Sequence, residues 1–284
     1  MKKNNLFQKV VKSKLKLGKP KVGFGLARPD KEILNSLRKS KKYADIILVG
    51  SKSIEKVVGF KKIITKNPEK LLPELLVKGE FNGIVRGTID DFKTFEAYQK
   101  LVGKNKTKKM IELALLEDAF GRQFFLSEGS NPLGWKLEEK IKNCEGIIKF
   151  IKKIGIKPKI GVITGVRHNT YKKRKSIKTG VIGILNKTYE DAEDIVKYFR
   201  KKKVAIKNYT IELDTAIKDN CNVIIPPNGM VGNQIFRALC LVGGGKTLIV
   251  SRANLPHPYE DNSRSEKDFE SHVKWLKAWI NGMK

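Results

Sequence analysis

The segment from Thr210 to Arg252 reads TIELDTAIKDNCNVIIPPNGMVGNQIFRALCLVGGGKTLIVSR, and it decides the fold class. Two short apolar runs within it, Asn222–Ile225 and Thr247–Val250, predict buried strands. A Pro/Gly loop and a helical segment separate the two runs, and a triple-Gly turn precedes the second. This pattern predicts a parallel βαβ unit and therefore an α/β protein.

The carboxyl ends of these two strands carry the first candidate site residues. Open parallel sheets bind ligands outside the carboxyl ends of their strands. Gly232 and Asn233 follow the first strand at the expected start of a helix, where backbone N–H groups favour anions. Ser251 and Arg252 follow the second strand. We expect these four residues to hold a small anion.

The rest of the chain continues the alternation of strands and helices. The runs Met110–Leu116 and Arg122–Leu126 follow each other with little helix between them, which predicts an antiparallel pair. A strand over Val181–Leu185 is expected after the basic loop Gly165–Gly180. We expect two α/β domains with a boundary near Gly155: residues 1–154 together with 254–284 form the first domain, and residues 155–253 form the second.

Composition indicates a globular protein of the cytoplasm. Apolar residues make up 40% of the 284 residues, and no run of about 18 apolar residues predicts a membrane span. The first residues lack the apolar core of a signal peptide. The three cysteines show no C-x-x-C pairing and indicate reduced thiols, and the three scattered histidines disfavour a typical zinc site. No pattern names a cofactor, which stays unknown.

The net charge of +30 raises the question of nucleic-acid binding. Lysine supplies 49 of the 59 basic residues, and no aromatic side chains interleave with them for base stacking. We therefore interpret the charge as a lysine-rich solvated surface. Binding of RNA or DNA stays as an alternative.

Arginine, in contrast, occurs only ten times, and several arginines stand just after predicted strands. A planar guanidinium grips a phosphate or carboxylate with two parallel hydrogen bonds, which lysine cannot do. The alternative is that one or two of them pair with structural carboxylates such as Asp118 or Glu128. The arginines that we expect to bind an anion are Arg28, Arg86, Arg167 and Arg252. Ser251 has no histidine at a motif spacing, so a Ser-His-Asp nucleophile is not supported.

Several of these motifs resemble a known superfamily. The motifs Asp214-Thr-Ala-Ile, Asn222-Val-Ile-Ile-Pro, Gly232-Asn233 and Lys246-Thr-Leu-Ile-Val-Ser-Arg-Ala resemble the C-terminal signature of phosphate acetyltransferases and phosphate butyryltransferases. Within that superfamily, Gly83-Ile-Val-Arg-Gly and Pro227-Asn-Gly-Met-Val-Gly-Asn-Gln resemble the MtxX family of methanogenic archaea, a marker family described as methyltransferase-related.

The resemblance implies an isopropylmalate-dehydrogenase-like, phosphotransacetylase-like fold. In such a fold two α/β domains with mostly parallel sheets flank an interdomain cleft, and the chain often forms a homodimer. In the acyltransferases a Ser-Arg pair binds the acyl-phosphate or CoA end, which implies catalytic roles for Ser251 and Arg252. An acidic residue shortly after that pair is proposed there to deprotonate the thiol. In this chain Glu260 and Asp261 come only later.

Three classes of function follow. The first is a transferase, either a methyltransferase or a phosphate acyltransferase-like enzyme, acting on a ligand such as phosphate, an acyl phosphate, CoA or a coenzyme M-like molecule. The second is a non-catalytic accessory subunit that senses such a ligand beside a methyltransferase partner subunit. The third is nucleic-acid binding through the lysine surface, which the arginines at strand ends disfavour.

Overall fold

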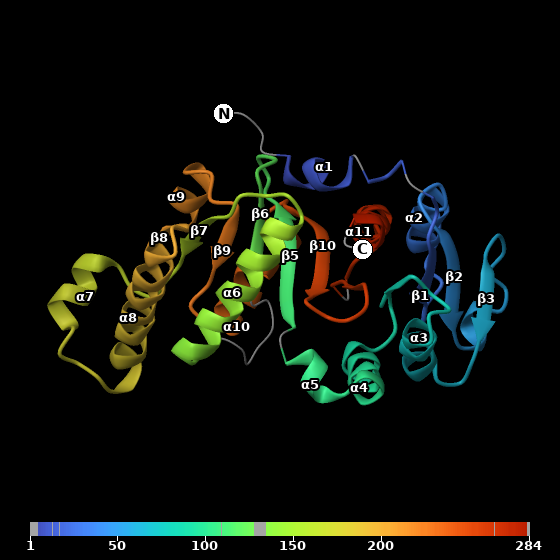
Figure 1. Cartoon of the computed structure of the whole chain (residues 1–284), viewed down its shortest axis with the longest axis horizontal. Helices are drawn as coiled ribbons and strands as arrows, with labels where there is room; N and C mark the ends of the chain where they lie inside the picture. The colour runs from blue at the N-terminus through green and yellow to red at the C-terminus, as the bar shows by residue number, and fades with distance from the viewer. Residues whose placement is uncertain are drawn as a thin grey trace. The chain divides into compact units, whose positions relative to one another are not determined.

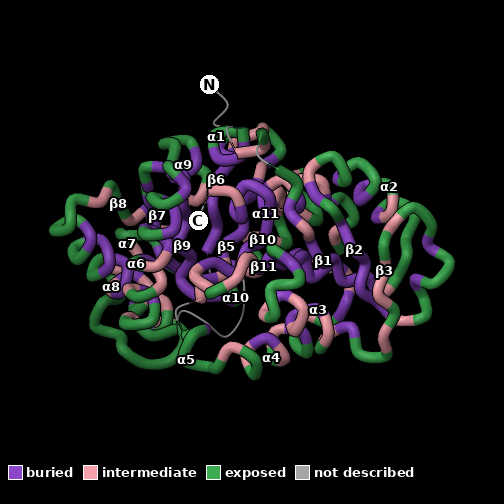
Figure 2. The backbone as a smooth tube through the Cα atoms, turned by 45° about the vertical axis from the view of Figure 1, so that its right-hand side comes forward, coloured by how far each residue is buried: buried purple, intermediate pink, exposed green. Residues whose placement is uncertain are grey.

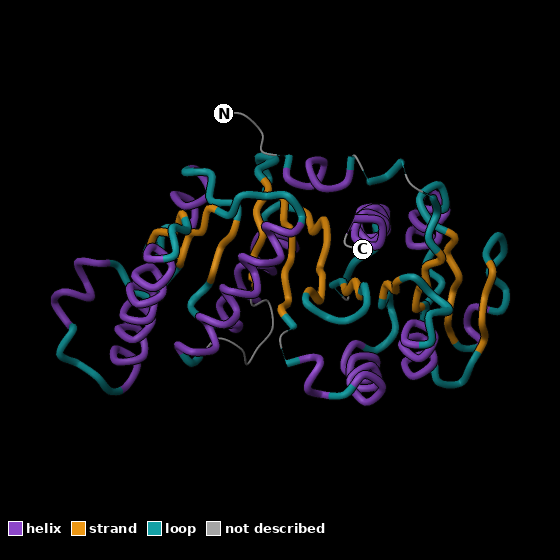
Figure 3. Tube along the Cα trace, in the orientation of Figure 1, coloured by secondary structure: helices purple, strands orange, loops and turns teal. Residues whose placement is uncertain are grey.

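A computed structural model describes residues 5–12, 14–16, 18–108, 110–127, 135–263 and 265–282 (Figure 1). Glu128, one of the carboxylates expected to pair with arginine, lies outside these residues. The chain divides into two compact units. Unit 1 contains residues 111–247 with the first residues up to Leu6, and unit 2 contains residues 7–110 and 248–284. Both are α/β units (Figure 3).

Unit 2 alternates strands and helices, and the end of the chain returns to it. Its elements are α1 (Leu6–Val11, from its second residue), β1 (Lys21–Gly25), α2 (Lys31–Ser40), β2 (Asp45–Gly50), the 3-10 turn η1 (Lys52–Ile54), β3 (Lys61–Ile64), α3 (Pro68–Val77), β4 (Gly83–Val85), α4 (Asp91–Val102), α5 (Lys104–Thr107), most of β10 (Lys246–Ala253), β11 (Tyr259–Asp261) and α11 (Glu270–Gly282). The strands lie in the order β3-β2-β1-β4-β11-β10. All neighbours are parallel except β10 and β11.

Helices cover both faces of this sheet. On one face α3 and α4 enclose a core that includes Leu72, Ile84 and Tyr259. On the other face α11 packs against α2, β4 and β11, and Phe24 meets Phe269 with ring centroids 4.8 Å apart. Burial of one such side chain stabilises the fold by roughly 1.5–3 kcal/mol. The strands β1 and β2 are therefore buried on both faces, as Figure 2 shows, which explains why they are apolar runs.

Unit 1 carries a second, smaller series of elements. They are β5 (Ile111–Glu117), β6 (Gln123–Ser127), α6 (Leu137–Lys153), β7 (Lys159–Val162), α7 (His168–Arg174), α8 (Gly180–Lys201), β8 (Ala205–Asn208), α9 (Leu213–Lys218), β9 (Val223–Ile225), α10 (Gly229–Arg237) and the π-helical turn η2 (Ala238–Val242). Its strands lie in the order β5-β6-β9-β7-β8. The antiparallel pair expected over residues 110–126 is confirmed as β5 and β6.

The unit boundary differs from the expected position near Gly155. It falls between Met110 and Ile111, and again between Thr247 and Leu248 within β10. The reason is that β6 pairs with β9, and α6 packs on both α8 and β5. These long-range contacts join the segment 111–154 to unit 1, and spacing along the sequence does not reveal them.

Three local expectations were wrong. Val181–Leu185 is not a strand but the start of α8, where Gly183 and Asn186 face inward at helical spacing. The strands β9 and β10 do not form a parallel βαβ pair, because β9 lies between β6 and β7 while β10 pairs with β11. Ser251 and Arg252 lie inside β10 rather than beyond its end, because the strand continues through Ala253.

Among the described residues, no helix combines the length and the apolar character needed to cross a membrane.

Two glycines allow the loops after β1 and β4 to touch. A Cβ atom on Gly87 would lie 2.1 Å from the carbonyl oxygen of Gly25, and one on Gly25 would lie 2.3 Å from the carbonyl oxygen of Arg86. Gly87 also has a φ of +65°, which L side chains rarely adopt. Any side chain at either position would force the carboxyl ends of β1 and β4 apart.

We predict that Gly87→Ala destabilises the protein by about 3 kcal/mol or more, because a left-handed φ and a steric clash add together. Gly79→Ala is the matched control in the same unit. Gly79 has a φ of +78° but no atom within 4 Å of the added Cβ, so we expect a loss of about 1–2 kcal/mol. Urea unfolding of both variants measures the difference. Equal losses would show that the contact between the two loops does not matter.

Candidate functional site

A hairpin brings two acidic residues beside Ser251 and Arg252. The strands β10 and β11 pair antiparallel, so that Ser251 lies opposite Glu260 and Val250 opposite Asp261. Successive side chains of a strand point to opposite faces of the sheet. Glu260 therefore points to the α11 side and Asp261 to the α4 side, which produces two separate buried polar clusters.

On the α4 side, Asp261 binds two arginines. Its Oδ1 accepts a hydrogen bond from Nε of Arg86 at 2.7 Å, and its Oδ2 accepts one from Nε of Arg252 at 3.0 Å. All three side chains are buried. Although burial alone raises the pKa of the Asp261 carboxyl, the charges of Arg252 and Arg86 hold it well below its ordinary value. Asp261 is therefore ionised, and the sequence-predicted Arg86 and Arg252 lie together around it.

The remaining donors of Arg86 bind backbone carbonyls. Nη1 donates to the carbonyl oxygens of Gly87 at 2.8 Å and Ile89 at 3.2 Å, and Nη2 donates to that of Asn262. The Asn262 side chain also donates to the Gly87 oxygen, at 2.9 Å. Arg86 thus fixes the loop after β4 to the end of β11.

Arg252 lies between aromatic rings and a second carboxylate. Its guanidinium carbon is 3.9 Å from the ring centroid of Phe95 and 5.5 Å from that of Tyr259, and Nη2 donates to Asp91 at the start of α4. Burial and the nearby charge of Asp261 raise the pKa of Asp91, while Arg252 opposes the shift. Two arginines and two aspartates make this cluster neutral when all four are ionised.

We predict that Arg86→Ala destabilises unit 2 by about 3–5 kcal/mol, because it leaves the buried Asp261 with only one arginine and removes this donor from the carbonyls of Ile89 and Asn262. Arg167→Ala is the control. Arg167 pairs with Glu212 at 2.9 Å on an exposed surface, and such pairs contribute about 0–1 kcal/mol. Chemical denaturation compares the two, and similar small losses would contradict the structural role of Arg86.

On the α11 side, Ser251 and Glu260 join His272 and Trp275. The Ser251 hydroxyl donates to Glu260 at 2.5 Å and accepts from the Trp275 indole at 2.8 Å, and Nδ1 of His272 lies 3.0 Å from Glu260. Burial raises the pKa of Glu260 to about 7 despite these hydrogen bonds. Burial lowers the pKa of His272, but hydrogen bonds and attraction to Glu260 and Glu266 outweigh it and raise the value to about 9.

This cluster predicts a pH-dependent stability. His272 keeps its proton in the folded state up to about pH 9, whereas an ordinary histidine releases it near 6.5. The folded state therefore binds more protons between these values, and stability falls as the pH rises through this window. We expect a loss on the order of 3 kcal/mol between pH 6.5 and 9. In His272→Gln this pH slope should shrink, and an unchanged slope in denaturation experiments would contradict the assignment.

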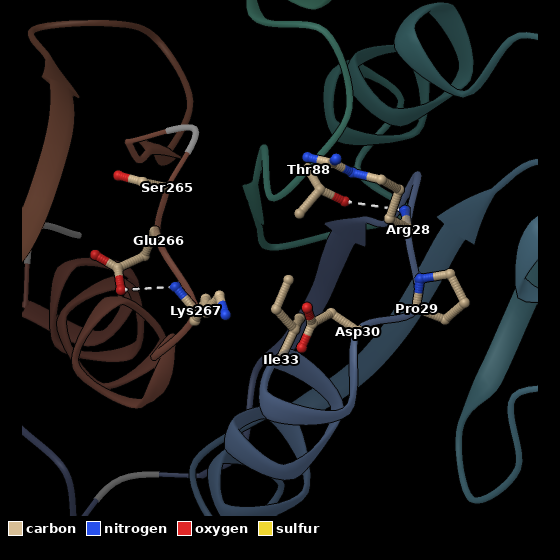
Figure 4. A pocket seen from close by; sticks show the side chains of 8 residues that line it. All are labelled: Arg28, Pro29, Asp30, Ile33, Thr88, Ser265, Glu266 and Lys267. Atoms are coloured by element: carbon tan, nitrogen blue, oxygen red, sulfur yellow. Dashed lines mark hydrogen bonds between the residues drawn. The ribbon is translucent and has the colours of Figure 1, made fainter.

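A pocket of about 500 Å³ lies at the carboxyl ends of β1 and β4. The chain runs from β1 to β2 on one side, while β4 pairs with the opposite side of β1. This change of direction is a topological switch point, where parallel sheets bind ligands. Figure 4 shows the loop after β1 facing the segment before α11 across the pocket. The residues that line it are Arg28, Pro29, Asp30, Ile33, Thr88, Ser265, Glu266 and Lys267.

Arg28 differs from Arg86 and Arg252 because its side chain is exposed. Across the described ranges, the Arg28 guanidinium makes no hydrogen bond or ion pair. Its backbone N–H and that of Ala27 donate to the Thr88 hydroxyl, at 3.4 and 2.9 Å, which ties the Arg28 loop to the loop after β4. Arg28 is thus held at the pocket by its backbone, and its guanidinium has no partner among the described residues.

The other charged residues of the pocket are already engaged. Asp30 accepts from the backbone N–H of Glu32 and caps α2, and Lys267 pairs with the Glu32 carboxylate at 2.6 Å. One oxygen of Glu266 accepts from the Lys267 backbone N–H, and the other lies 3.7 Å from Nε2 of His272. Glu266 therefore connects the pocket wall with the buried Ser251 cluster.

The remaining predicted residues lie in unit 1. Arg167 directly precedes α7 and is exposed. Gly232 and Asn233 were expected at a helix start, but α10 begins at Gly229, and Asn228 caps it by accepting from the N–H of Val231 at 3.0 Å. The Gly232 N–H already binds the Asn228 carbonyl oxygen at 3.0 Å, so it is not directed at an anion.

The alternative interpretation, pairing with structural carboxylates, holds for Arg86 and Arg252, which both bind Asp261, and for Arg122, which pairs with Asp118 at 2.6 Å. Within the described parts of the chain, no group of three histidine, cysteine, aspartate or glutamate side chains is arranged to hold a metal ion.

The sequence did not predict that Asp91 joins the Asp261 cluster, or that His272 and Glu266 join the Ser251 cluster. One signal was present: Asn254 and Pro258 are turn residues that bracket a loop, and a hairpin there aligns Glu260 and Asp261 with the Ser-Arg pair. Nothing in the sequence indicates that residues 265–267 meet the loop after β1.

No protein-family model matches the chain. A Methanosarcina mazei protein named "Putative methyltransferase mtx subunit X" is 30% identical over 272 residues, which span 94% of this chain and 93% of that protein. A Methanosarcina barkeri protein of the same name is 29% identical over 262 residues, 91% of this chain and 92% of its own length.

Solved structures show the fold. A branched-chain phosphotransacylase from Enterococcus faecalis aligns with a TM-score of 0.67 at 14% identity, covering 90% of this chain and 98% of that one. The EutD phosphotransacetylase from Staphylococcus aureus aligns with a TM-score of 0.64 at 14% identity, covering 96% and 98%. The chain therefore has the phosphotransacetylase-like α/β fold that its motifs predict.

Proposed function

The chain belongs to the mtx subunit X family of methanogenic archaea, and from this membership we propose that it binds a small phosphate- or carboxylate-bearing ligand and acts in methyl transfer. The methyl-transfer part of this proposal rests on the names of the relatives. The ligand class is inferred from the side chains of the pocket.

One observation carries the ligand proposal: the pocket at the switch point of unit 2 has at its edge the guanidinium of Arg28, which is unpaired among the described residues. A volume of about 500 Å³ falls within the range of small-molecule sites. A guanidinium binds phosphate or carboxylate through two parallel N–H groups, and its charge needs no pKa shift to persist. The carboxylates of Asp30 and Glu266 in the pocket wall favour a ligand that also carries a hydroxyl or amine donor.

Ser251 and Arg252 stay proposed site residues, and their contacts support a positioning role. Both are buried, and their polar groups bind Glu260 and Asp261. Through Asp261, Arg252 shares a network with Arg86, which fixes the loop that continues to Thr88 in the pocket wall. Ser251 belongs to the Glu260 cluster, which Glu266 connects to the same wall. Arg167 and Asn233 stay proposed anion contacts of unit 1, whereas the backbone N–H of Gly232 is used within α10.

The phosphotransacetylase-like fold favours one alternative, a phosphate acyltransferase-like activity on an acyl phosphate and CoA. The relatives' designation as a subunit favours another, an accessory protein that senses the ligand beside a methyltransferase partner. Binding experiments with different ligands separate acyl transfer from methyl transfer.

We predict that Arg28→Ala weakens binding of the anionic ligand about tenfold or more, because a hydrogen bond to a charged group contributes roughly 1.5–3 kcal/mol. Thermal shift with phosphate, acetyl phosphate, CoA, coenzyme M and S-adenosylmethionine identifies the ligand, and calorimetry then measures its affinity. A ligand at a hundredfold excess over Kd stabilises by about 2.7 kcal/mol.

Arg38→Ala is the matched control, since it removes the same charge from the exposed surface of α2. Arg28→Lys should restore only part of the affinity, because an ammonium cannot form the bidentate contact. Stabilisation by acyl phosphate and CoA would favour acyl transfer, and stabilisation by coenzyme M or S-adenosylmethionine would favour methyl transfer. The proposed site is wrong if Arg28→Ala and Arg38→Ala bind the ligand equally well.

A further inference from the structure

The junction of α7 and α8 in unit 1 presents a basic surface with an apolar centre. From Gly165 to Tyr189 the chain has seven lysines and arginines and no acidic residue. Residues 172–181 are all exposed, and they include the run Lys172-Lys-Arg-Lys175. We call residues 172–184 the basic tip.

Three aliphatic side chains are exposed within the basic tip: Ile177 (40%), Val181 (73%) and Ile184 (55%). Val181 and Ile184 are three residues apart in the first turns of α8 and lie on one face of that helix, and Ile177 lies in the segment between α7 and α8. Lysines surround them, and the side chains of Lys172, Lys173 and Lys175 make no ion pair within the described part of the chain.

The basic tip is held in one conformation. Asn186 is buried and donates through Nδ2 to the carbonyl oxygens of Arg174 at 2.7 Å and Ile177 at 2.9 Å. A Cβ atom on Gly183 would lie 2.4 Å from the Lys178 carbonyl, so the turn rests directly on α8. The rings of Tyr171 and Tyr189 stack at 4.2 Å and join the two helices. A surface fixed in this way loses little entropy when it binds.

We propose that the basic tip docks an acidic protein partner whose contact surface has an apolar centre and a carboxylate rim. Interfaces between proteins typically have an apolar core inside a polar rim, and opposite charges select the partner. A second copy of this chain does not fit, because its tip would place like charges opposite each other.

Nucleic acid and membrane fit the basic tip less well. Single-stranded nucleic acids stack their bases on exposed aromatic rings, but Tyr171 and Tyr189 stack on each other. Phosphates facing Val181 and Ile184 would leave these side chains against a charged surface. A membrane-binding helix typically adds Trp or Phe to its apolar face, and the basic tip has neither.

The experiment uses two labelled helical peptides of identical composition, rich in glutamate and leucine. One places its leucines on a single face, and the other distributes them around the helix. Fluorescence anisotropy at physiological salt should show at least about tenfold tighter binding of the first peptide by the full-length protein. Val181→Asp combined with Ile184→Asp should abolish this preference.

Charge is tested separately. Reversal of Lys172, Lys173 and Lys175 to Glu should weaken binding of the patterned peptide about tenfold or more. Reversal of Lys149, Lys152 and Lys153, which are exposed on α6 of the same unit, is the matched control and should have a much smaller effect. All these side chains are exposed, and circular dichroism confirms that the variants fold.

Each remaining outcome overturns the proposal. Equal binding of the two peptides would show that the basic tip attracts any anion. Duplex DNA, a structured RNA or phosphatidylserine vesicles could instead bind more tightly than the patterned peptide. If the same lysine reversal abolishes that binding, the basic tip belongs to that partner. A homodimer that the lysine reversal dissociates in analytical ultracentrifugation would assign it to self-association.

Discussion

The carboxylate of Asp261 is the interaction on which the arrangement of unit 2 depends. It binds Arg86 from the end of β4 and Arg252 from β10, and it does so in a buried position. Removing these charges from water costs several kcal/mol per ion, which only complete pairing offsets. The cluster is therefore stable only when β4, β10 and β11 are all in place, so it selects this one arrangement of the three strands.

The same constraint fixes the register of β11. Its three residues alternate, so that Tyr259 and Asp261 face α4 while Glu260 faces α11. A slip of one residue would move Glu260 toward the arginines and leave His272 and Ser251 facing Asp261 or Tyr259. Short strands have few backbone hydrogen bonds to define their register. Here two chemically different clusters on opposite faces define it instead.

The sequence predicted the fold class because buried parallel strands are short apolar runs between turn residues. Because arginine is rare in this lysine-rich chain, the sequence also singled out Arg86 and Arg252, but as contacts for an anionic ligand. It could not predict that both bind Asp261, because partners 175 and 9 residues away are brought together only by the sheet. Val181–Leu185 read as a strand because its β-branched residues have high strand propensity, whereas packing of Gly183 and Asn186 requires a helix. The segment 265–267 carries no apolar pattern, so its place beside Arg28 depends entirely on tertiary structure.

Arginine and lysine have separate roles in this molecule. Arg86 and Arg252 are buried, where a planar group with five fixed donors can satisfy carbonyls and carboxylates at once, and a lysine ammonium could not. Most lysines lie in solvent, where the ammonium group keeps its hydration shell. The net charge of +30 is therefore a sum over residues with different roles and does not by itself indicate a binding function. We propose that a basic residue of this chain takes part in binding only where the fold holds it in place and leaves its charge unpaired. The backbone contacts of its loop with Thr88 hold Arg28 in place, and within the described residues its guanidinium has no partner.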